Sequence, residues 1–485
     1  MQISRSANLR PRAATVLMVA ALAVLALLSI ACMDLDTDCA PGDGSCDPLA
    51  AFALYNAPCH ARSWQTYFGS LADATQPEGL VPTIDGAIAG VGRTRQSFGN
   101  PIIALPTPGT RTLLVFRFNE DGALEWHTFL GEVQDRPTFI ALADDGYVVA
   151  ATAIASFGTP LQAFSGANDI IVAKLDFSGN LQWHTYIGTV GGNESAGGIL
   201  LTAAGEIQVS GEGNAVLTNA GTAISPNTNI LSEQMLIVRL TADGAPIWHS
   251  FFGGTGNETA RAMVALDASF VNQRNAFAGG AADDHVLVAF SEAGAYQWHA
   301  FYGSVTNEAI STMLRYPDGT ILAGGRAAAS WGTPVAGHPL PGSSAMNFFR
   351  FDADGNIQWN TFTGDSVTGS QLSNAFLAPT SDSELWFVGS VNGSFGQPPA
   401  GREYTAQFDV AVGSLESSTG RLLRVGFWGG SGQDVSSPSA AVNTCDQGLI
   451  VGGASDAEFG TPIEAQSAPG IGRGLMLKLA PRDVP

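Results

Sequence analysis

The sequence predicts an all-β protein: a seven-bladed β-propeller whose blades are four-stranded antiparallel sheets. The main observation is a phrase that places a tryptophan near the start of a short strand, as in LQWHTYIG and YQWHAFYG. The phrase returns about every 60 residues, which is typical of a chain built from repeated units. Tryptophan occupies its key position six times, and arginine takes that position in a seventh copy: Trp64, Trp126, Trp183, Trp248, Trp298, Trp359 and Arg424.

Glycines give the second and third observations. One glycine follows each key position five residues later, at Gly69, Gly131, Gly188, Gly253, Gly303, Gly364 and Gly429. Another precedes each key position except Trp64 by four residues, at Gly122, Gly179, Gly244, Gly294, Gly355 and Gly420. Glycine supplies the positive φ that tight hairpin turns require, so the second set marks turns.

Each repeat contains four short strands, which we name A, B, C and D in chain order. In the third repeat we expect them at 183–188, 197–202, 206–211 and 235–240, which are ordinary strand lengths. A glycine turn joins B to C, and a second one joins D to the next A. Helical solenoids are excluded because no apolar 3.6-residue periodicity appears, and a parallel β-helix lacks such paired tight turns.

The repeat region begins with an A strand that has no D strand before it, and it ends with a D strand that has no A strand after it. The first recognisable strand is an A strand at Trp64, and the last is a D strand at 474–479. The first A strand should therefore pair with the last D strand, which closes the ring and removes a sheet edge. In such a ring the B–C and D–A turns lie on one face, and the A–B and C–D loops lie on the other.

The repeat resembles the bacterial SBBP-type β-propeller repeat over about residues 62–481. The matching elements are W-x-T-[FY]-x-G, an acidic residue soon afterwards, a glycine before strand C, the S-F-G-x-P stretch, and a D strand that ends as KLDFSGN at 174–180. The fourth repeat lacks S-F-G-x-P, and the seventh lacks the tryptophan. The resemblance implies the propeller fold and says little about activity.

The N-terminus predicts export. Arg5, Arg10 and Arg12 precede an uncharged apolar run from Ala13 to Ala31, and Leu28-Ser29-Ile30-Ala31-Cys32 resembles a bacterial lipobox. We therefore expect residues 1–31 to be a lipoprotein signal peptide, with Cys32 lipidated, and residues 32–61 to be an acidic linker. A plain cleaved signal and an uncleaved anchor are the alternatives. We expect the protein to lie at an outer membrane or at the cell surface, where several acyl chains hold it to the membrane.

The charge limits the partners. The formal net charge is −21, and removal of residues 1–31, which contain three arginines and no acids, lowers it to −24. Such a chain cannot neutralise phosphates, so nucleic acid is not an expected partner. We expect a monomer that contacts the membrane through its lipid and binds a protein or a polysaccharide.

Four cysteines remain if Cys32 carries lipid: Cys39, Cys46, Cys59 and Cys445. Export permits disulfides, and three pairings are possible. We favour Cys39–Cys46 and Cys59–Cys445. Cys59 comes just before the first A strand, and Cys445 lies in the last B–C turn, so both fall on one face of the closing blade.

Two sets of residues on the A–B and C–D loops are candidates for a ligand or ion face. The first is an acid after most A strands: Asp73, Asp135, Glu194, Glu258, Glu308 and Asp434. These could form a negative ring that binds Ca²⁺ or a basic partner, or they could accept backbone N–H bonds and fix blade to blade. The second is the aromatic residue of the S-F-G-x-P stretch, which could plug the space between blades or contact a ligand: Phe98, Phe157, Trp331, Phe395 and Phe459.

Four histidines follow the key tryptophans: His127, His184, His249 and His299. Equivalent positions in neighbouring blades are at least about 10 Å apart, whereas metal–imidazole bonds are about 2 Å. We therefore expect half-buried strand residues here and no metal site. The tryptophans, at one strand position throughout, suit packing between blades better than sugar stacking.

No nucleophile elbow, HExxH, P-loop or dinucleotide-binding motif is present, so no catalytic residues and no cofactor are assigned. We expect a lipid-anchored envelope propeller that binds a protein or a glycan without catalysis. The alternatives are an enzyme resembling the quinoprotein dehydrogenases, which share tryptophan-anchored blades, and a purely structural envelope scaffold.

Overall fold

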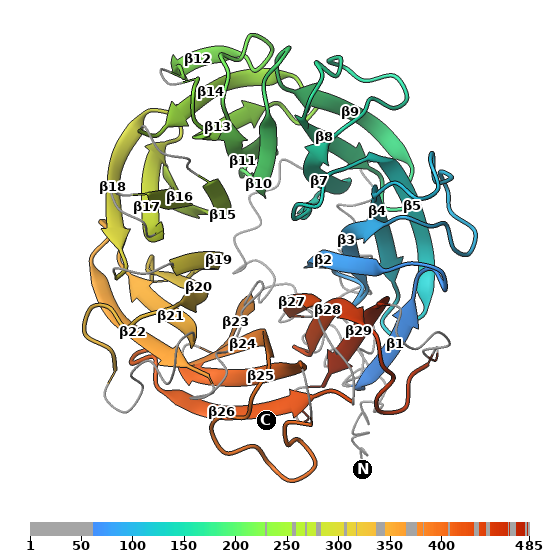
Figure 1. The fold of residues 1–485 in the computed structure, drawn as a ribbon, viewed down its shortest axis with the longest axis vertical. Helices are drawn as coiled ribbons and strands as arrows, with labels where there is room; N and C mark the ends of the chain where they lie inside the picture. Colours follow the sequence, from blue (N-terminus) through green and yellow to red (C-terminus); the bar gives the residue numbers. More distant parts are fainter. Residues whose placement is uncertain are drawn as a thin grey trace, which may run out of the picture. The chain divides into compact units, whose positions relative to one another are not determined.

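The computed structural model describes residues 62–485 apart from 228–229, 255–258, 267–268, 278–282, 305–307, 317, 336–344, 365–375, 382, 406–407, 431–435, 443–446, 464, 466–471, 481–482 and 484–485. Every regular element in the described part of the chain is a β-strand (Figure 1). No described helix is long and apolar enough to span a membrane. The molecule is a β-propeller of four-stranded antiparallel blades.

The described strands form seven sheets, of which six have four strands and one has five. In the first three sheets along the chain, the strands are β2 (Thr75–Pro82), β3 (Ile88–Thr94), β4 (Thr112–Phe118) and β5 (Leu124–Glu132); β6 (Phe139–Ala143), β7 (Gly146–Ala153), β8 (Asp169–Leu175) and β9 (Leu181–Ile187); and β10 (Glu194–Leu201), β11 (Ile207–Gly213), β12 (Thr222–Ser225), β13 (Gln234–Leu240) and β14 (Pro246–Phe252).

The remaining four sheets repeat the same order. Their strands are β15 (Thr259–Leu266), β16 (Ser269–Phe277), β17 (Asp283–Ser291) and β18 (Tyr296–Tyr302); β19 (Glu308–Arg315), β20 (Ile321–Ala327), β21 (Ala345–Phe351) and β22 (Ile357–Thr363); β23 (Phe376–Ser381), β24 (Glu384–Val391), β25 (Asp409–Glu416) and β26 (Leu422–Trp428); and β27 (Ser436–Val442), β28 (Leu449–Ser455), β29 (Arg473–Leu479) and β1 (Trp64–Phe68).

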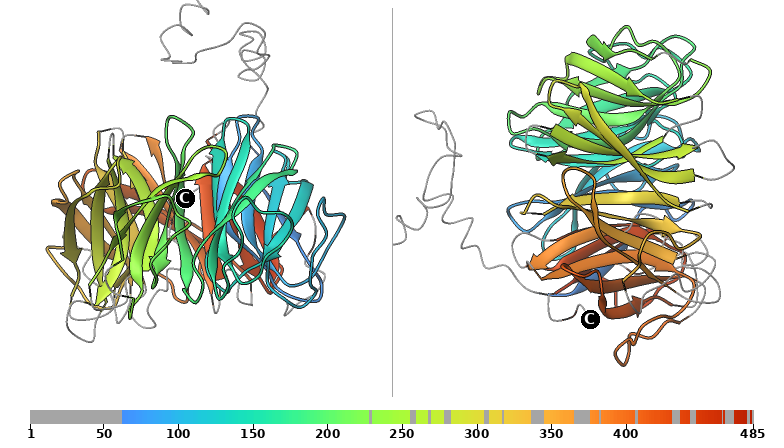
Figure 2. Two further views of the ribbon diagram at one scale, coloured as in Figure 1. Left: turned by 90° about the horizontal axis from the view of Figure 1, so that it is seen from above. Right: turned by 90° about the vertical axis from the view of Figure 1, so that its left-hand side faces the viewer.

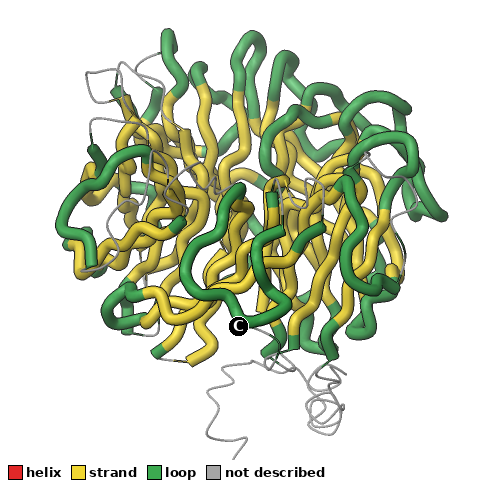
Figure 3. The backbone as a smooth tube through the Cα atoms, turned by 60° about the horizontal axis from the view of Figure 1, so that its bottom comes forward, coloured by secondary structure: helices red, strands yellow, loops and turns green. Residues whose placement is uncertain are grey.

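Strand B of each sheet lies at the centre and strand A lies at the rim (Figure 1). The central strands β2, β6, β10, β15, β19, β23 and β27 contact one another in this order, and β27 contacts β2. The sheets stand side by side around one axis, as the two further views show (Figure 2). The loops lie at the two ends of the strands (Figure 3).

The core lies between neighbouring blades, which explains why the middle strands are almost wholly apolar. Every residue of β7 is buried, because both faces of its sheet are covered. Val149 and Ala151 pack towards the preceding blade with Val91 and Leu113, whereas Val148 and Ala150 pack towards the following one. A strand buried on both faces shows a continuous apolar run instead of an alternating one.

The first strand pairs with the last. Strand β1 is antiparallel to β29, with Trp64 opposite Lys478 and Phe68 opposite Gly474. The backbone N–H of Ala480 also donates to the Ser63 hydroxyl at 2.8 Å. The seam of the sheet formed by β27, β28, β29 and β1 is therefore held by backbone pairing along the whole of β1.

The expectation of four strands in every blade is wrong for the third repeat, where β12 adds a fifth strand parallel to β14. The extra strand arises because the C–D loops run along the outer strand of their own blade and form hydrogen bonds with it. Ile102 donates its N–H to the His127 carbonyl at 2.9 Å, and Leu161 donates to the His184 carbonyl at 2.8 Å. In the third repeat this contact extends into a short strand that covers the sheet edge.

Candidate functional site

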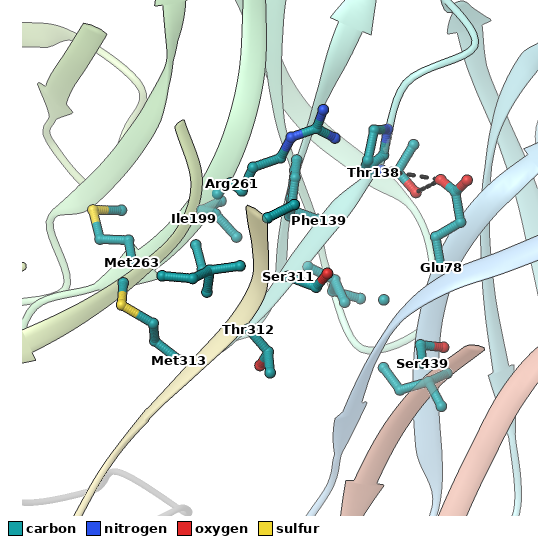
Figure 4. A pocket seen from close by; sticks show the side chains of 18 of the residues that line it. Glu78, Thr138, Phe139, Ile199, Arg261, Met263, Ser311, Thr312, Met313 and Ser439 are labelled. Atoms are coloured by element: carbon teal, nitrogen blue, oxygen red, sulfur yellow. Dashed lines mark hydrogen bonds between the residues drawn. The ribbon is translucent and has the colours of Figure 1, made fainter. Parts of the chain in front are cut away.

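The central channel contains a cavity of about 510 Å³, a size typical of small-molecule sites. Its wall consists mainly of the central strands β2, β6, β10, β15 and β19, with contributions from β3, β20 and β27. Figure 4 shows side chains from several of these strands converging on it, among them Arg261, Phe139 and Met263. The cavity is the structure's strongest candidate for a ligand site.

β-Bulges aim side chains into this cavity. Strand register shifts between Pro77 and Gly79 in β2, between Ala260 and Met263 in β15, and between Ile310 and Thr312 in β19. The extra residues at these shifts include Glu78, Arg261 and Ser311, which all line the cavity. Bulges leave a residue unpaired and redirect it, and they are common beside functional sites.

The first polar group at the cavity is an ion-pair network centred on Arg93. Its guanidinium binds the buried carboxylate of Glu78, with Nε to Oε1 at 3.0 Å, and also pairs with Asp135. Arg111 pairs with the other oxygen of Asp135 at 2.8 Å. Glu78 also accepts hydrogen bonds from the N–H and hydroxyl of Thr138, at 3.0 and 2.9 Å. Burial raises the pKa of Glu78, although Arg93 opposes the shift. The network ties β2 to the start of the next blade.

A second, smaller cavity of about 340 Å³ adjoins the first and shares Asp135, Pro137, Phe139 and Arg261 with it. Arg136 lines this second cavity and pairs with the buried carboxylate of Glu212. Arg136 and Arg261 therefore stand close to one another at the boundary between the two spaces.

Arg261 and Arg326 make no hydrogen bond and no ion pair within the part of the chain that the structure describes, and both are exposed to the cavity. Burial lowers the pKa of Arg261; the charge of Glu212 opposes that shift, and the charges of Arg136 and Arg326 reinforce it. Within the described residues, two arginines that form no ion pair thus face the channel of a chain whose net charge is −21.

Apolar side chains line the cavity beside these arginines. They come from five central strands and include Leu80, Ile140, Ile199, Met263, Ile310 and Met313. Met263 follows Arg261 by two residues on β15, so charged and apolar surfaces meet within one strand. Figure 4 shows Met263, Met313 and Ile199 on the side of the cavity opposite Glu78.

Of the described acids that follow the A strands, Asp135 lines the cavity and the others do not. Asp135 lines the cavity and binds two arginines, as described above. The Asp73 Oδ2 lies 4.0 Å from the Arg95 Nε. Glu308 is buried and accepts a hydrogen bond from the Ser304 hydroxyl at 2.5 Å. Glu258 and Asp434 lie outside the described residues. The described acids thus occupy positions that fit the structural alternative, in which each one holds loops and blades together.

Glu194 is the most unusual of these acids because it is fully buried beside another buried carboxyl group, Asp169. Burial raises the pKa of Glu194 to about 8; the N–H of Thr189 opposes the shift, and the charge of Asp169 reinforces it. Burial also raises the pKa of Asp169, although that group accepts two hydrogen bonds from Ser165. This pKa favours the protonated form of Glu194 at neutral pH.

The aromatic residues of the S-F-G-x-P stretches are fastened to the outer strand of their own blade. Phe98 stacks on His127 with ring centroids 4.2 Å apart, and Phe157 stacks on His184 at the same distance. In both blades the histidine Nε2–H donates to the carbonyl of that phenylalanine at 2.8 Å. This geometry fits the packing interpretation of these aromatic residues.

In other blades, other side chains of the outer strand form the same hydrogen bond with the C–D loop. Asn360 donates to the Trp331 carbonyl at 2.7 Å, and Gln65 donates to the Phe459 carbonyl. Trp331 and Phe395 are themselves buried, and Gly396, beside Phe395, packs on Val425. We name this contact, between the residue after the key position and the C–D loop, the loop latch.

The histidine interpretation needs one correction. His127, His184 and His249 are buried, where we expected half-buried side chains, because the C–D loop covers them. His249 donates through Nδ1 to the Ala220 carbonyl at 3.0 Å. His299 is exposed and contacts Tyr296. Among the described residues no three His, Cys, Asp or Glu side chains gather as a metal site.

The packing role predicted for the tryptophans is confirmed, and its partner is the glycine of the D–A turn. Trp64 lies against Gly122 of the next blade, and Trp183 lies against Gly244, where an added Cβ would come within 2.6 and 2.7 Å of the indole. The Trp64 Nε1–H also donates to the Glu120 carbonyl in the same turn at 2.8 Å. The tryptophan and the later glycine therefore repeat together because they form one contact.

The lipidation site Cys32, the paired candidates Cys39 and Cys46, and the paired candidates Cys59 and Cys445 all lie outside the described residues. The signal peptide, the linker and both disulfides therefore stay predictions.

Sequence reasoning missed the arginines of the channel, although a signal for them exists. Strand C carries glycine followed by a charged residue in three repeats: Gly92-Arg93, Gly211-Glu212 and Gly325-Arg326. A Cβ at each of these glycines would come within 2.1 Å of a carbonyl oxygen of the bulged central strand. Glycine is therefore required beside the bulge, and the next residue stands at the channel.

No protein-family model matches this chain, and no curated protein matches it either. Among solved structures it is similar to virginiamycin B lyase from Staphylococcus aureus, with 11% identity, a TM-score of 0.44, and coverage of 86% of this chain and 100% of that one. It is also similar to the periplasmic gluconolactonase of Pseudomonas aeruginosa, with 12% identity, a TM-score of 0.42, and coverage of 84% and 100%. Similarities this distant carry no argument about the activity of this protein.

Proposed function

We propose that this protein is an exported, lipid-anchored β-propeller that binds a protein or a glycan without catalysing a reaction. The observation that supports the proposal is the cavity of about 510 Å³ in the channel, whose wall combines charged, polar and apolar side chains. A rigid ring of sheets holds these groups in fixed positions, which lowers the ordering cost of binding.

We further infer that the seven sheets are seven blades of one closed ring. The pairing of β1 with β29 and the contact of β27 with β2 support this inference. The repeat phrase also supports a relationship to the SBBP-type propellers, which the proposal includes.

The binding proposal is tested by filling the cavity. Ser311 lies on the bulge of β19 and lines the cavity, so Ser311→Trp should obstruct it. Ser178→Trp is the matched control, because Ser178 is exposed in a D–A turn. The full-length protein and both variants are applied to glycan and peptide arrays. We expect the protein and the Ser178→Trp control to bind a common ligand, and Ser311→Trp to lose it.

Two results of this experiment would contradict the proposal. If Ser311→Trp keeps full binding, the cavity is not the site. If no glycan or peptide binds the unmodified protein, the binding function itself fails.

The anchor is tested separately at Cys32, which follows the lipobox-like residues Leu28-Ser29-Ile30-Ala31. In cells fed a clickable fatty acid, the full chain should be labelled and should sediment with membranes. Cys32→Ser should lose the label. If the label persists in this variant, Cys32 is not the acylated residue.

A further inference from the structure

The two unpaired arginines of the channel differ from most other arginines of this protein. Arg93, Arg117, Arg239 and Arg350 all pair with carboxylates, as expected in a chain with 43 acidic and 22 basic residues. Arg261 and Arg326 instead line the cavity without a hydrogen bond or an ion pair among the described residues. The charge of Glu212 acts on Arg261, but the carboxylate of Glu212 already pairs with Arg136. A cavity wall that carries such cations attracts anions, because charge of one sign concentrates counter-ions in a cleft.

The charges of the cavity wall also favour an anionic ligand. Burial lowers the pKa of Arg261; the charge of Glu212 opposes this shift, and the like charges of Arg136 and Arg326 add to it. Glu212 already forms an ion pair with Arg136. Repulsion between guanidinium groups strengthens as water leaves a site, because the effective dielectric constant falls. A bound anion between Arg261 and Arg326 would relieve that repulsion.

The apolar part of the wall restricts what else the ligand carries. Met263, Ile310 and Met313 lie beside the arginines, together with Ile199 and Leu80 from other strands. A polyhydroxylated sugar would leave hydroxyl groups unpaired against this surface, which is costly. Of the two ligand classes in the proposed function, the wall therefore favours a protein over a glycan. An apolar body matches this surface.

We propose that the channel binds a ligand that carries a carboxylate next to an apolar group, with the carboxylate on Arg261 and Arg326 and the apolar group on Met263, Met313 and Ile199. This inference rests on the proposed binding function and names the ligand chemistry of the same cavity. Arginine suits the head group because its planar fork matches the two oxygens of a carboxylate. A monoanion also costs less to transfer into a partly apolar cavity than a dianion does.

Two sources supply this chemistry: a free organic acid with an apolar body, and a polypeptide C-terminus whose last side chain is apolar. The probes are octanoate against octanamide for the first source, and acetyl-Leu-Phe with a free carboxylate against its C-terminal amide for the second. Octyl phosphate tests the identity of the head group. Binding is measured by isothermal titration calorimetry on the full-length protein.

We expect at least one carboxylate to bind 10-fold or more tightly than its amide partner. Arg261→Gln and Arg326→Gln should each weaken that carboxylate by about 10-fold or more, since charge-assisted hydrogen bonds are the strong ones. Met313→Ser should weaken the carboxylate and its amide alike. Arg421→Gln is the matched control, because Arg421 is exposed beside a D–A turn, and it should leave every affinity unchanged.

Several results would overturn the inference. One is equal affinity for carboxylate and amide, and another is tighter binding of octyl phosphate than of either acid. A third is unchanged carboxylate affinity in both arginine variants while their melting temperatures match that of the unmodified protein. If these probes fail but an array ligand still depends on Ser311, the ligand chemistry is wrong and the binding proposal stands. If no array ligand binds either, both the ligand chemistry and the binding proposal fail.

Discussion

His184 and Asn360 occupy the same position in two blades and make the same contact, each donating a hydrogen bond to the carbonyl of the aromatic residue in its C–D loop. What the fold requires at this position is a buried N–H donor of suitable length, and the imidazole as such is not needed. Gln65 meets the same requirement at the seam. The recurrence of histidine therefore reflects the loop latch and does not indicate a metal or a catalytic base.

This equivalence predicts how substitutions at His184 behave. His184→Asn should change the free energy of unfolding by less than about 1 kcal/mol, since asparagine is native at the equivalent position. His184→Ala should cost about 2–3 kcal/mol, because it leaves the buried Phe157 carbonyl unpaired and removes a stacked ring. Urea denaturation measures both, and the exposed His299→Ala should be neutral. An equal loss for asparagine and alanine would show that the latch does not depend on the hydrogen bond.

Glu194 predicts a dependence of stability on pH. Its pKa is raised from 4.5 to about 8 in the folded protein, so the folded state holds a proton that the unfolded state releases. The resulting contribution is fully present below about pH 4.5 and is lost as the pH rises towards 8.

Glu194→Gln should therefore flatten the curve of unfolding free energy against pH between 4.5 and 8, and should be more stable than the unmodified protein at pH 8. Glu78, whose pKa is also raised, keeps part of the slope in both proteins. The exposed Asp243→Asn should follow the unmodified curve. If Glu194→Gln does the same, Glu194 is not protonated in the folded state.

At the scale of single residues, the sequence identifies which positions recur but not what they do. Repetition alone could not separate Asp135, which lines the cavity, from Glu194, which is buried beside Asp169, because both follow an A strand. Arg261 could not be found from repetition at all, since its position at the cavity depends on the bulge of β15.

Among the elements, the contact between each tryptophan and the D–A turn of the next blade sets the spacing of the blades. Gly244 and Gly205 allow this contact to be tested cleanly. Both end a four-residue turn that begins at threonine, and both have a positive φ, +84° and +74°. An added Cβ at Gly244 would come within 2.7 Å of Trp183, whereas nothing lies within 4 Å of one at Gly205.

Gly205→Ala should cost about 1–2 kcal/mol through the strain of a left-handed backbone alone. Gly244→Ala should cost about 1–3 kcal/mol more, because the indole must move. The comparison is made by thermal and urea denaturation, with tryptophan fluorescence reporting the indole. Equal losses in the two variants would mean that the tryptophan does not pack on the turn in solution.

Strand order and hairpin turns were predictable because a glycine turn between two apolar runs is a local signal. The bulges of the central strands were not, because they depend on how closely a neighbouring carbonyl approaches, as at Gly92 and Gly325. The fifth strand β12 was also missed. Its sequence, TAIS, lies in a long loop and forms a strand only where β14 offers an edge.

For the whole molecule, the pairing of β1 with β29 joins residues more than 400 positions apart. A cross-link between Cys59 and Cys445, which we predict from the sequence, would add to this seam by restricting the unfolded chain. In the entropic model a loop of this length contributes about 6 kcal/mol, and measured values are often smaller.

Peptide mapping under non-reducing conditions should therefore recover Cys59 joined to Cys445, and Cys39 joined to Cys46. Reduction should lower the melting temperature, and Cys445→Ser should show that lowered temperature before reduction. Cys46→Ser should have little effect on the propeller, because both Cys39 and Cys46 lie in the predicted linker. Recovery of Cys445 as a free thiol would contradict the assignment.

Arg424 stands where the other repeats have tryptophan, and the sheet that follows it is the one whose last strand meets β1 without a covalent turn. With no hairpin glycine to cover, the indole has no partner, and Arg424 pairs with Glu384 instead. Arg424 thus precedes the one described sheet whose last two strands, β29 and β1, are not joined by a hairpin turn. A circular permutant that links Leu479 to Trp64 through a glycine turn and opens the chain between Leu240 and Pro246 would need tryptophan at 424, and it would release Trp183 from its constraint.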